Sequence, residues 1–244
     1  MNLTGGISWH WLAWRSQARW APTAQAIEQW LLQSAQALPT KESHEKPTLL
    51  LIGASAGWMM SCQWLSQFAR VDTFDIDPLA AFLFKLRHGA ALKAQGVVLN
   101  CHTQDALQNL DALLAAHPKA MVFFDNVLGQ IRFQNPRTDQ AEKRLGSVTQ
   151  ALHGRHWGSV HDHLSGPVLK AWPEAPLPQA QVCVQGDGRE SMFTQQWLGA
   201  MGAQSPWLDH LTETVFPGGT ALTNMAWPMK PSYWHWLQAG WVRP

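Results

Sequence analysis

The chain has 244 residues, of which 46% are hydrophobic and 14% charged, and its formal net charge at pH 7 is +1. This length and apolar content suffice for one large domain or two small ones with a buried core. No run of lysine or arginine exceeds two residues, so the chain offers no electrostatic track for nucleic acid, and we expect no nucleic-acid partner.

Cysteine usage and hydropathy indicate the compartment. Cys62, Cys101 and Cys183 lie far apart in the chain, which argues against a disulfide framework or a zinc knuckle. The N-terminal segment lacks the apolar run of a secretory signal, and no stretch reaches the length of a membrane span. We therefore expect a cytoplasmic protein with reduced thiols and no membrane association.

Two helices are expected at the N-terminus, over residues 8–20 and 23–38, the second capped by Thr23. A charged linker between Pro39 and Pro47 follows. The two expected helices are rich in tryptophan, with five tryptophans among the first thirty residues of the chain: Trp9, Trp11, Trp14, Trp20 and Trp30. These side chains either pack a helical cap on the core, line a substrate pocket, or form an exposed surface for a protein partner or a second copy of the chain.

From residue 48 onward, segments with strand character alternate with segments of helical spacing. The run 48–52 is continuously apolar, as expected for a strand covered on both faces. Further strands are expected at 71–75, 97–101, 120–125 and 157–163, and helices at 57–69, 78–92, 105–116 and 138–153. Successive strand–helix units of this kind predict a parallel sheet with right-handed crossovers.

The alternation is lost after residue 163. We expect an irregular excursion over 164–190, a helix over 191–201, and a final strand pair or hairpin over 219–244 with a short helix around 231–239. The predicted fold is α/β, with a doubly wound, mainly parallel sheet and an N-terminal helical cap. Its expected parts are a cap and linker (1–46), a cofactor-binding core (47–165), and a substrate-side excursion whose final strands complete the same domain (166–244).

A turn of small residues and a strand that ends in acid carry the first functional signal. The first strand leads into Gly53-Ala54-Ser55-Ala56-Gly57, and the second ends in Asp75-Ile76-Asp77. Small residues let a ligand approach the backbone, and a helix that starts near Gly57 would point free N–H groups at that space. A carboxylate at the next strand end can accept two ribose hydroxyls. The pair predicts a site for a nucleotide-type cofactor.

Acidic residues also follow the third and fourth strands, in Gln104-Asp105-Ala106-Leu107 and in Asp125-Asn126. This order of motifs resembles class I S-adenosylmethionine-dependent methyltransferases over about residues 48–165. The resemblance implies S-adenosylmethionine as cofactor, with Asp75 on the ribose and Asp105 on the adenine. The chain departs from the family pattern at Leu51, where an acid is common, and at Ser55, where glycine is usual. The implied cofactor-binding residues are Gly53, Ala54, Ser55, Gly57, Asp75, Ile76, Asp77, Gln104, Asp105, Ala106, Asp125 and Asn126.

Two other enzyme classes fit part of the turn. Gly53 to Gly57 also matches the Gly-x-Ser-x-Gly elbow of serine hydrolases, which would make Ser55 the nucleophile, with Asp125 as orienter and His161, His163 or His210 as base. Too few residues precede the turn for the strands and oxyanion-hole segment of that fold. A nicotinamide enzyme would need Gly-x-Gly-x-x-Gly, but Ser55 and Met60 replace the second and third glycines.

Candidate catalytic residues follow the fourth strand and end the fifth. The amide of Asn126 could orient an amine or hydroxyl of the acceptor, and His161 or His163 could serve as a general base. The segment around Asn126 lacks the Asn/Asp-Pro-Pro-Tyr/Phe motif of amino-directed nucleic-acid methyltransferases. With Asp209 and His210 the two histidines would also make a metal-ligand set, but no metal is expected.

The resemblance and these residues together predict methyl transfer from S-adenosylmethionine to a small-molecule acceptor. The alternative from another class is a methyltransferase-like binding or scaffold protein without turnover. Such a protein would form a stable complex or homodimer through its tryptophan-rich N-terminal segment.

Overall fold

The computed structural model describes residues 3–35, 46–135, 137–174, 177–204 and 206–244. None of the helices in these ranges is long and apolar enough to span a membrane. The chain divides into two compact units: a first unit of Met1–Gln17 and Ile27–Asp125, and a second unit of Ala18–Ala26 and Asn126–Pro244. The three-part domain division expected from the sequence stays a prediction.

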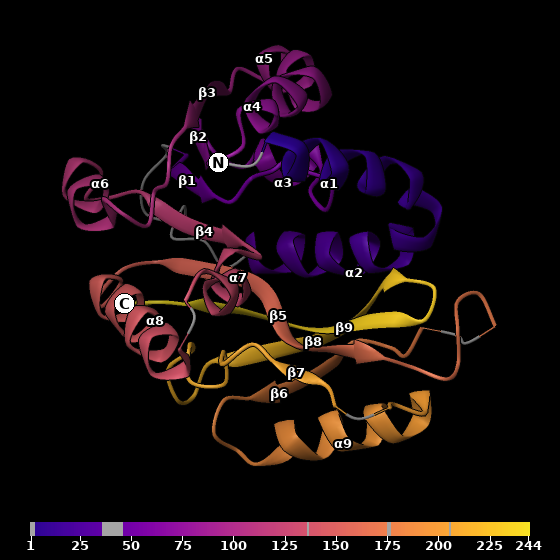
Figure 1. The fold of residues 1–244 in the computed structure, drawn as a ribbon. Helices are drawn as coiled ribbons and strands as arrows, with labels where there is room; N and C mark the ends of the chain where they lie inside the picture. Colours follow the sequence, from indigo (N-terminus) through magenta and orange to yellow (C-terminus); the bar gives the residue numbers. More distant parts are fainter. Residues whose placement is uncertain (1–2, 36–45, 136, 175–176, 205) are drawn as a thin grey trace. The chain divides into compact units, whose positions relative to one another are not determined.

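The first unit contains a parallel sheet with the strand order β3-β2-β1-β4, drawn in violet to magenta in Figure 1. Its strands are β1 (Thr48–Ile52), β2 (Arg70–Asp75), β3 (Val98–Thr103) and β4 (Met121–Asp125). All three pairings are parallel, and Leu49, Leu50 and Leu51 of the central strand are fully buried. The α/β fold and the parallel arrangement predicted from the alternating pattern are confirmed.

The register of this sheet aligns three chain segments at its carboxyl edge. Ile52 pairs with Phe74 on one side and with Phe124 on the other. The residues that follow these three, Gly53, Asp75 and Asp125, therefore lie at the same level along the strands. The N–H of Gly53 donates to the carbonyl of Phe74 at 2.8 Å, which extends the β1–β2 ladder by one bond into the turn.

The helices that follow β1 and β3 begin later than their sequence pattern predicts. α3 (Cys62–Leu65) starts five residues after Gly57, because Ser61 accepts the N–H of Trp64 and acts as its N-cap. α6 starts at Leu110 instead of 105. The expectation of a helix N-terminus at Gly57 is therefore wrong. The predicted helix 78–92 is present as one continuous segment, α4 (Pro78–Phe84), the π-helix η2 (Lys85–Gly89) and α5 (Ala90–Ala94).

The N-terminal helices are α1 (Leu3–Arg15) and α2 (Gln17–Ala35), so the break between them lies at Ser16 and not near Pro22. Pro22 lies inside α2, and Thr23 is no cap: its buried hydroxyl donates to the carbonyl of Ala226 at 2.9 Å, within the second unit. Residues 36–38 of the predicted second helix, and most of the predicted linker, lie outside the described residues.

The second unit is built on antiparallel strands, drawn in orange to yellow in Figure 1. β9 lies between β5 and β8, β6 pairs with β8, and β7 pairs with β5. The strands are β5 (Trp157–Pro167), β6 (Gln181–Val184), β7 (Leu208–Asp209), β8 (Ala221–Lys230) and β9 (Tyr233–Val242). The helices are α7 (Val127–Gln134), α8 (Thr138–Ala151) and α9 (Arg189–Met201).

Several sequence expectations for this unit need correction. β5 continues to Pro167, so His161 and His163 lie inside the strand and not at its end. The expected excursion contains β6, and helix α7 follows directly after Asn126. The predicted final hairpin is confirmed, but residues 233–239 are strand and not helix. Trp234 and Trp236, two residues apart on β9, are fully buried, and Trp236 stacks on Trp197 of α9 with ring centroids 4.5 Å apart.

Candidate functional site

The turn after β1 has the tight backbone that its small residues suggest. Gly53, Ser55 and Gly57 have φ angles of +77°, +47° and +62°, and Ala54 and Ala56 are buried. A Cβ atom on Gly57 would lie 2.5 Å from Nε2 of His88 and 3.0 Å from the ring of Phe84. Gly57 therefore serves close packing against η2 as well as the left-handed turn.

Asp75 at the end of β2 holds this turn in place. Its Oδ2 accepts the N–H of Ser55 at 2.7 Å, and its Oδ1 accepts the N–H of Asp77 at 2.8 Å. Burial raises the pKa of the Asp75 carboxyl, although these two N–H groups favour its charged form. A carboxylate oxygen can accept two hydrogen bonds, so each oxygen of Asp75 retains capacity for one hydroxyl of a ligand.

Helix α1 lies against the turn and the following loop, all within the first unit. The indole Nε1–H of Trp9 donates to Oγ of Ser55 at 3.2 Å, and Nε2 of His10 lies 3.0 Å from Oδ2 of Asp77. Nδ1 of His10 accepts the indole N–H of Trp58 at 3.4 Å, so its Nε2 carries the proton that Asp77 accepts. Sequence reasoning missed these contacts, because nothing local pairs the two helix residues with partners 46 and 67 residues away.

Asp77 and the segment after β3 lie next to Asp75. Asp77 is the N-cap of α4, with Oδ1 accepting the N–H of Leu79, while its neighbour Ile76 is 45% exposed. The N–H of Gln104 donates to the carbonyl of Asp75 at 2.9 Å. The two oxygens of Asp105 accept the N–H of Leu107 and the amide of Gln108, each at 3.0 Å, and Ala106 is buried.

Asp125 ends β4 at the level of Asp75, with β1 between the two strands. Burial, and secondarily the negative charge of Asp75, raise the pKa of Asp125 to about 7. Two neighbouring carboxyl groups thus lie at the carboxyl edge of the sheet on either side of the Gly53 turn. Edges of this kind are where open parallel α/β sheets bind ligands.

The other predicted site residues belong to the second unit. The imidazole of His161 is fully buried, with Nδ1 2.9 Å from Oγ of Ser159 and its ring stacked on Phe216. Burial, helped by the charge of His163, lowers the pKa of His161 to about 3. An imidazole with this pKa is a weak base near pH 7. Nδ1 of His163 lies 3.3 Å from Oγ1 of Thr212, and burial lowers its pKa as well.

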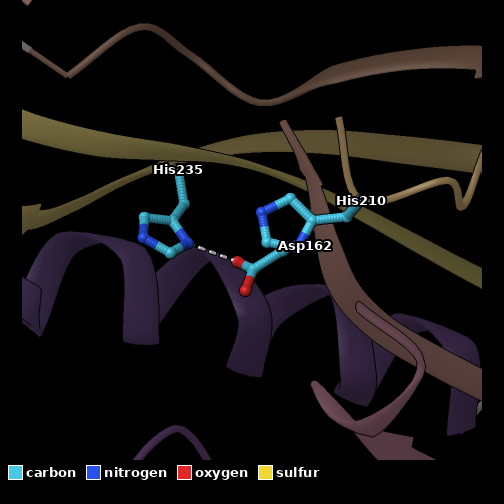
Figure 2. Close-up of side chains that lie close together, drawn as sticks. All are labelled: Asp162, His210 and His235. Carbon is cyan, nitrogen blue, oxygen red and sulfur yellow. Dashed lines mark hydrogen bonds and ion pairs between the residues drawn. The ribbon is translucent and has the colours of Figure 1, made fainter. Parts of the chain in front are cut away.

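Asp162, between these two histidines, is the centre of a polar cluster that sequence reasoning missed. Asn126 donates its Nδ2–H to Oδ2 of Asp162 at 2.9 Å, and Nδ1 of His235 lies 2.7 Å from Oδ1. Burial by itself raises the pKa of Asp162, but His235, with help from His210 and Asn126, holds it below its ordinary value. Figure 2 shows the Asp162 carboxylate between the rings of His235 and His210.

No family model matches the chain, and no curated protein is significantly similar to it in sequence. Three solved structures with similarity to it are described as methyltransferases, the family that the motif order resembles. Their sequence identities to this chain are 11–13%, and their TM-scores are below 0.5.

The first of the three is the magnesium protoporphyrin IX methyltransferase of Synechocystis PCC 6803 with bound SAH, with 13% identity, a TM-score of 0.44, and 88% of this chain and 82% of that chain covered. A SAM-dependent methyltransferase from Anabaena variabilis has 13% identity and a TM-score of 0.43, and the match covers 91% of this chain and 94% of that chain. A proposed RNA methyltransferase from Pyrococcus horikoshii has 11% identity and a TM-score of 0.42, and the match covers 89% of this chain and 83% of that chain.

Proposed function

We propose that the protein transfers a methyl group from S-adenosylmethionine to a small-molecule acceptor, with the cofactor held at the carboxyl edge of the β3-β2-β1-β4 sheet. The observation that carries the proposal is the geometry of Asp75. Its carboxylate ends β2 beside the small-residue turn, and the N–H groups of Ser55 and Asp77 orient both of its oxygens. A fixed carboxylate with remaining acceptor capacity suits the two adjacent hydroxyls of a ribose.

The rest of the proposed cofactor site follows from the same edge. The turn from Gly53 to Gly57, with its small side chains, is assigned to the methionine portion, Ile76 and Asp77 continue from Asp75, and the Gln104-Asp105-Ala106 segment is assigned to the adenine. Asp125 ends β4 at the level of the turn, and we assign it to the positively charged sulfonium end. Asn126 is part of the proposal on sequence grounds alone, since it belongs to the second unit.

The chemistry proposed is an in-line displacement. A lone pair of the acceptor atom forms a bond to the methyl carbon as the carbon–sulfur bond breaks, and the electron pair of that bond leaves on sulfur as a neutral thioether. The acceptor loses its proton to a base or to water. Orientation of the two reactants supplies most of the rate enhancement in such a transfer. Asn126, His161 and His163 stay predictions for contacts with the acceptor; of the two histidines, His163 suits a basic role better, given the low pKa of His161.

The low net charge and the absence of basic runs in the sequence favour a small acceptor over a nucleic acid. A methylation assay with radiolabelled S-adenosylmethionine should therefore include total RNA beside pools of small amines, phenols and carboxylic acids. Transfer to RNA would replace the small-molecule part of the proposal and leave the methyl-transfer part intact.

The test of the cofactor is a calorimetric titration of the full chain with S-adenosylmethionine and, in parallel, with NADH. We expect saturable binding of the first alone, and at least a tenfold weaker affinity for Asp75→Asn, which retains the size of the side chain but loses its charge. Asp111→Asn is the matched control, because Asp111 is an exposed carboxylate of the same unit. Equal affinity of the Asp75 variant and the wild type, or binding of NADH alone, would overturn the proposal.

A binding or scaffold protein is the second candidate, favoured by one feature of α1. Ile7, Trp11 and Trp14 follow one another at helical spacing and are 58%, 56% and 65% exposed. Exposed apolar side chains on one helix face are typical of a partner surface. Light scattering after gel filtration distinguishes the candidates: a stable dimer that Trp14→Ser dissolves, without turnover of S-adenosylmethionine, would favour the scaffold.

The hydrolase alternative receives little support. Ser55 has the positive φ of a sharp turn, but its Oγ accepts the indole N–H of Trp9. The three histidines proposed as its base have hydrogen-bond partners within the second unit: Ser159 for His161, Thr212 for His163, and Ser165 with Gly129 for His210. Labelling of Ser55 by a serine-directed fluorophosphonate would restore this alternative.

A further inference from the structure

Three side chains of the second unit bring together ligand atoms suited to a metal ion. One atom each from Asp162, His210 and His235 lies within 4.8 Å of the other two. Asp162 comes from β5, His235 from β9, and His210 directly follows β7. β5 pairs with both other strands, so the sheet itself brings the three residues together. Figure 2 shows the two imidazole rings on either side of the carboxylate.

The partners of these side chains are of the kind that orients metal ligands. Nδ1 of His210 lies 3.0 Å from the carbonyl oxygen of Gly129, which can only accept, so Nδ1 carries the proton and Nε2 offers its lone pair. Oδ2 of Asp162 accepts from Asn126 at 2.9 Å, which leaves Oδ1 toward His235. Metal-binding histidines commonly donate their second N–H to a carbonyl, and metal-binding carboxylates are commonly hydrogen-bonded in this way.

The backbone is irregular at two of the three positions. The register between β5 and β9 shifts between Asp162 and Leu164, which marks a bulge that redirects side chains. Leu211, next to His210, has a φ of +62°, an unfavourable value for a residue with a branched side chain. Irregularities of both kinds cluster at sites where side-chain direction matters more than ladder regularity.

We propose that Asp162, His210 and His235 bind one divalent first-row transition-metal ion, a site beyond the methyl-transfer function. Two imidazoles and one carboxylate suit Zn²⁺ or Fe²⁺ and leave at least one coordination position for water or a substrate atom. Asp162 and His210 are buried, whereas the side chain of His235 is 12% exposed, so the ion enters from the His235 side.

Binding requires a rearrangement of protons. The ion replaces the hydrogen bond between Nδ1 of His235 and Asp162, and the Nδ1 proton of His235 moves to Nε2 or to solvent. Nε2 of His210 gives up the hydroxyl of Ser165, 2.9 Å away, which can turn its hydrogen toward the hydroxyl of Tyr233 at 3.3 Å. Every donor released by the ion thus has another acceptor, in the cluster or in solvent.

The test is titration of the full chain, stripped with a chelator, with Zn²⁺ by calorimetry and with Co²⁺ by visible absorption. We expect one equivalent of Zn²⁺, and Co²⁺ ligand-field bands of a site with nitrogen and oxygen ligands. His235→Gln and His210→Gln should each weaken Zn²⁺ binding by more than the roughly 10–100-fold that loss of an outer partner costs. Asn126→Gly removes only an outer partner of Asp162, so it should weaken Zn²⁺ binding by roughly 10–100-fold.

The matched control is His153→Ala, which removes an exposed histidine of the same unit. It should leave stoichiometry and affinity unchanged, and circular dichroism should show that every variant is folded. The proposal is wrong if the folded wild type binds no stoichiometric ion, or if the two glutamine variants bind Zn²⁺ as tightly as the wild type. Equal loss in His153→Ala would point to unspecific surface binding and would overturn it as well.

Discussion

Asn126 and Asp162 are joined by two hydrogen bonds that run in opposite directions. Nδ2 of Asn126 donates to Oδ2 of Asp162 at 2.9 Å, while Oδ1 of Asn126 accepts the backbone N–H of Asp162 at 2.8 Å. Asn126 adopts a left-handed conformation with φ of +55°, which asparagine, aspartate and glycine tolerate best. The amide thereby connects the start of α7 to the middle of β5.

Replacement of this amide should destabilise the second unit in graded steps. Asn126→Asp keeps the shape but turns a donor toward Asp162 into a like charge, so we expect a loss of about 3–5 kcal/mol at pH 7. Asn126→Gly keeps the backbone conformation and loses only the hydrogen bonds, at about 1–3 kcal/mol. Urea unfolding measures both, and a smaller loss for Asp than for Gly would contradict this account of the pair.

Asp125 should make stability depend on pH. Its pKa in the folded protein is about 7, raised by burial and by Asp75 from 3.8. The folded state therefore binds more protons than the unfolded state between these values, so the free energy of unfolding falls as pH rises from about 4 to 7 and levels off above. The full shift corresponds to roughly 4 kcal/mol.

Asp125→Asn should remove this dependence. We expect the variant to match the wild type near pH 4.5 and to be more stable than the wild type at pH 8, by up to a few kcal/mol. Urea unfolding at the two pH values provides the comparison, with Asp111→Asn as a control that follows the wild type. Parallel pH profiles of the wild type and Asp125→Asn would show that this carboxyl does not titrate as described.

Gly57 and Gly96 separate backbone strain from packing. Both have positive φ, of +62° and +75°, but a Cβ on Gly57 meets His88 and Phe84, whereas nothing lies within 4 Å of a Cβ on Gly96. Gly96→Ala should cost about 1–2 kcal/mol of strain. Gly57→Ala should cost a further 1–3 kcal/mol, roughly, because the two rings must move. Thermal or urea unfolding measures the difference between the two variants. Equal losses of stability would show that the rings of His88 and Phe84 move aside without a cost in free energy.

The attachment of α1 to the turn should depend on the indole of Trp9. Trp9→Phe keeps the ring and loses the donor to Ser55, which we expect to weaken docking of α1 by about 1 kcal/mol. Hydrogen–deuterium exchange of the amides of residues 3–15 should then quicken about fivefold. Trp14→Phe is the control on the same helix, since Trp14 is 65% exposed. Exchange that changes equally in both variants would contradict a specific role of Trp9.

Local patterns were sufficient to predict the parallel strands and to bring the residues of the proposed cofactor site to one edge of their sheet. Apolar runs, small-residue turns and strand-end acids are signals within a few residues, and they placed β1 to β4, the Gly53–Gly57 turn and Asp75 at the same edge. They failed for the helix starts. Ser61 is the N-cap of α3, so the helix begins at Cys62. The helical spacing of apolar residues from 57 onward does not indicate this later start.

The alternating architecture and the polar residues at the carboxyl edge of the parallel sheet thus follow from the amino-acid order alone, because parallel strands must end on one side. Long-range packing is what brings Trp9 to the β1 turn and His10 to Asp77, makes residues 233–239 a strand, and joins Asp162, His210 and His235. These contacts depend on antiparallel pairing and helix docking between positions far apart in the chain, such as Trp9 with Ser55 and Asp162 with His235. The hydrophobic pattern within a short window of sequence does not specify which distant residues pair.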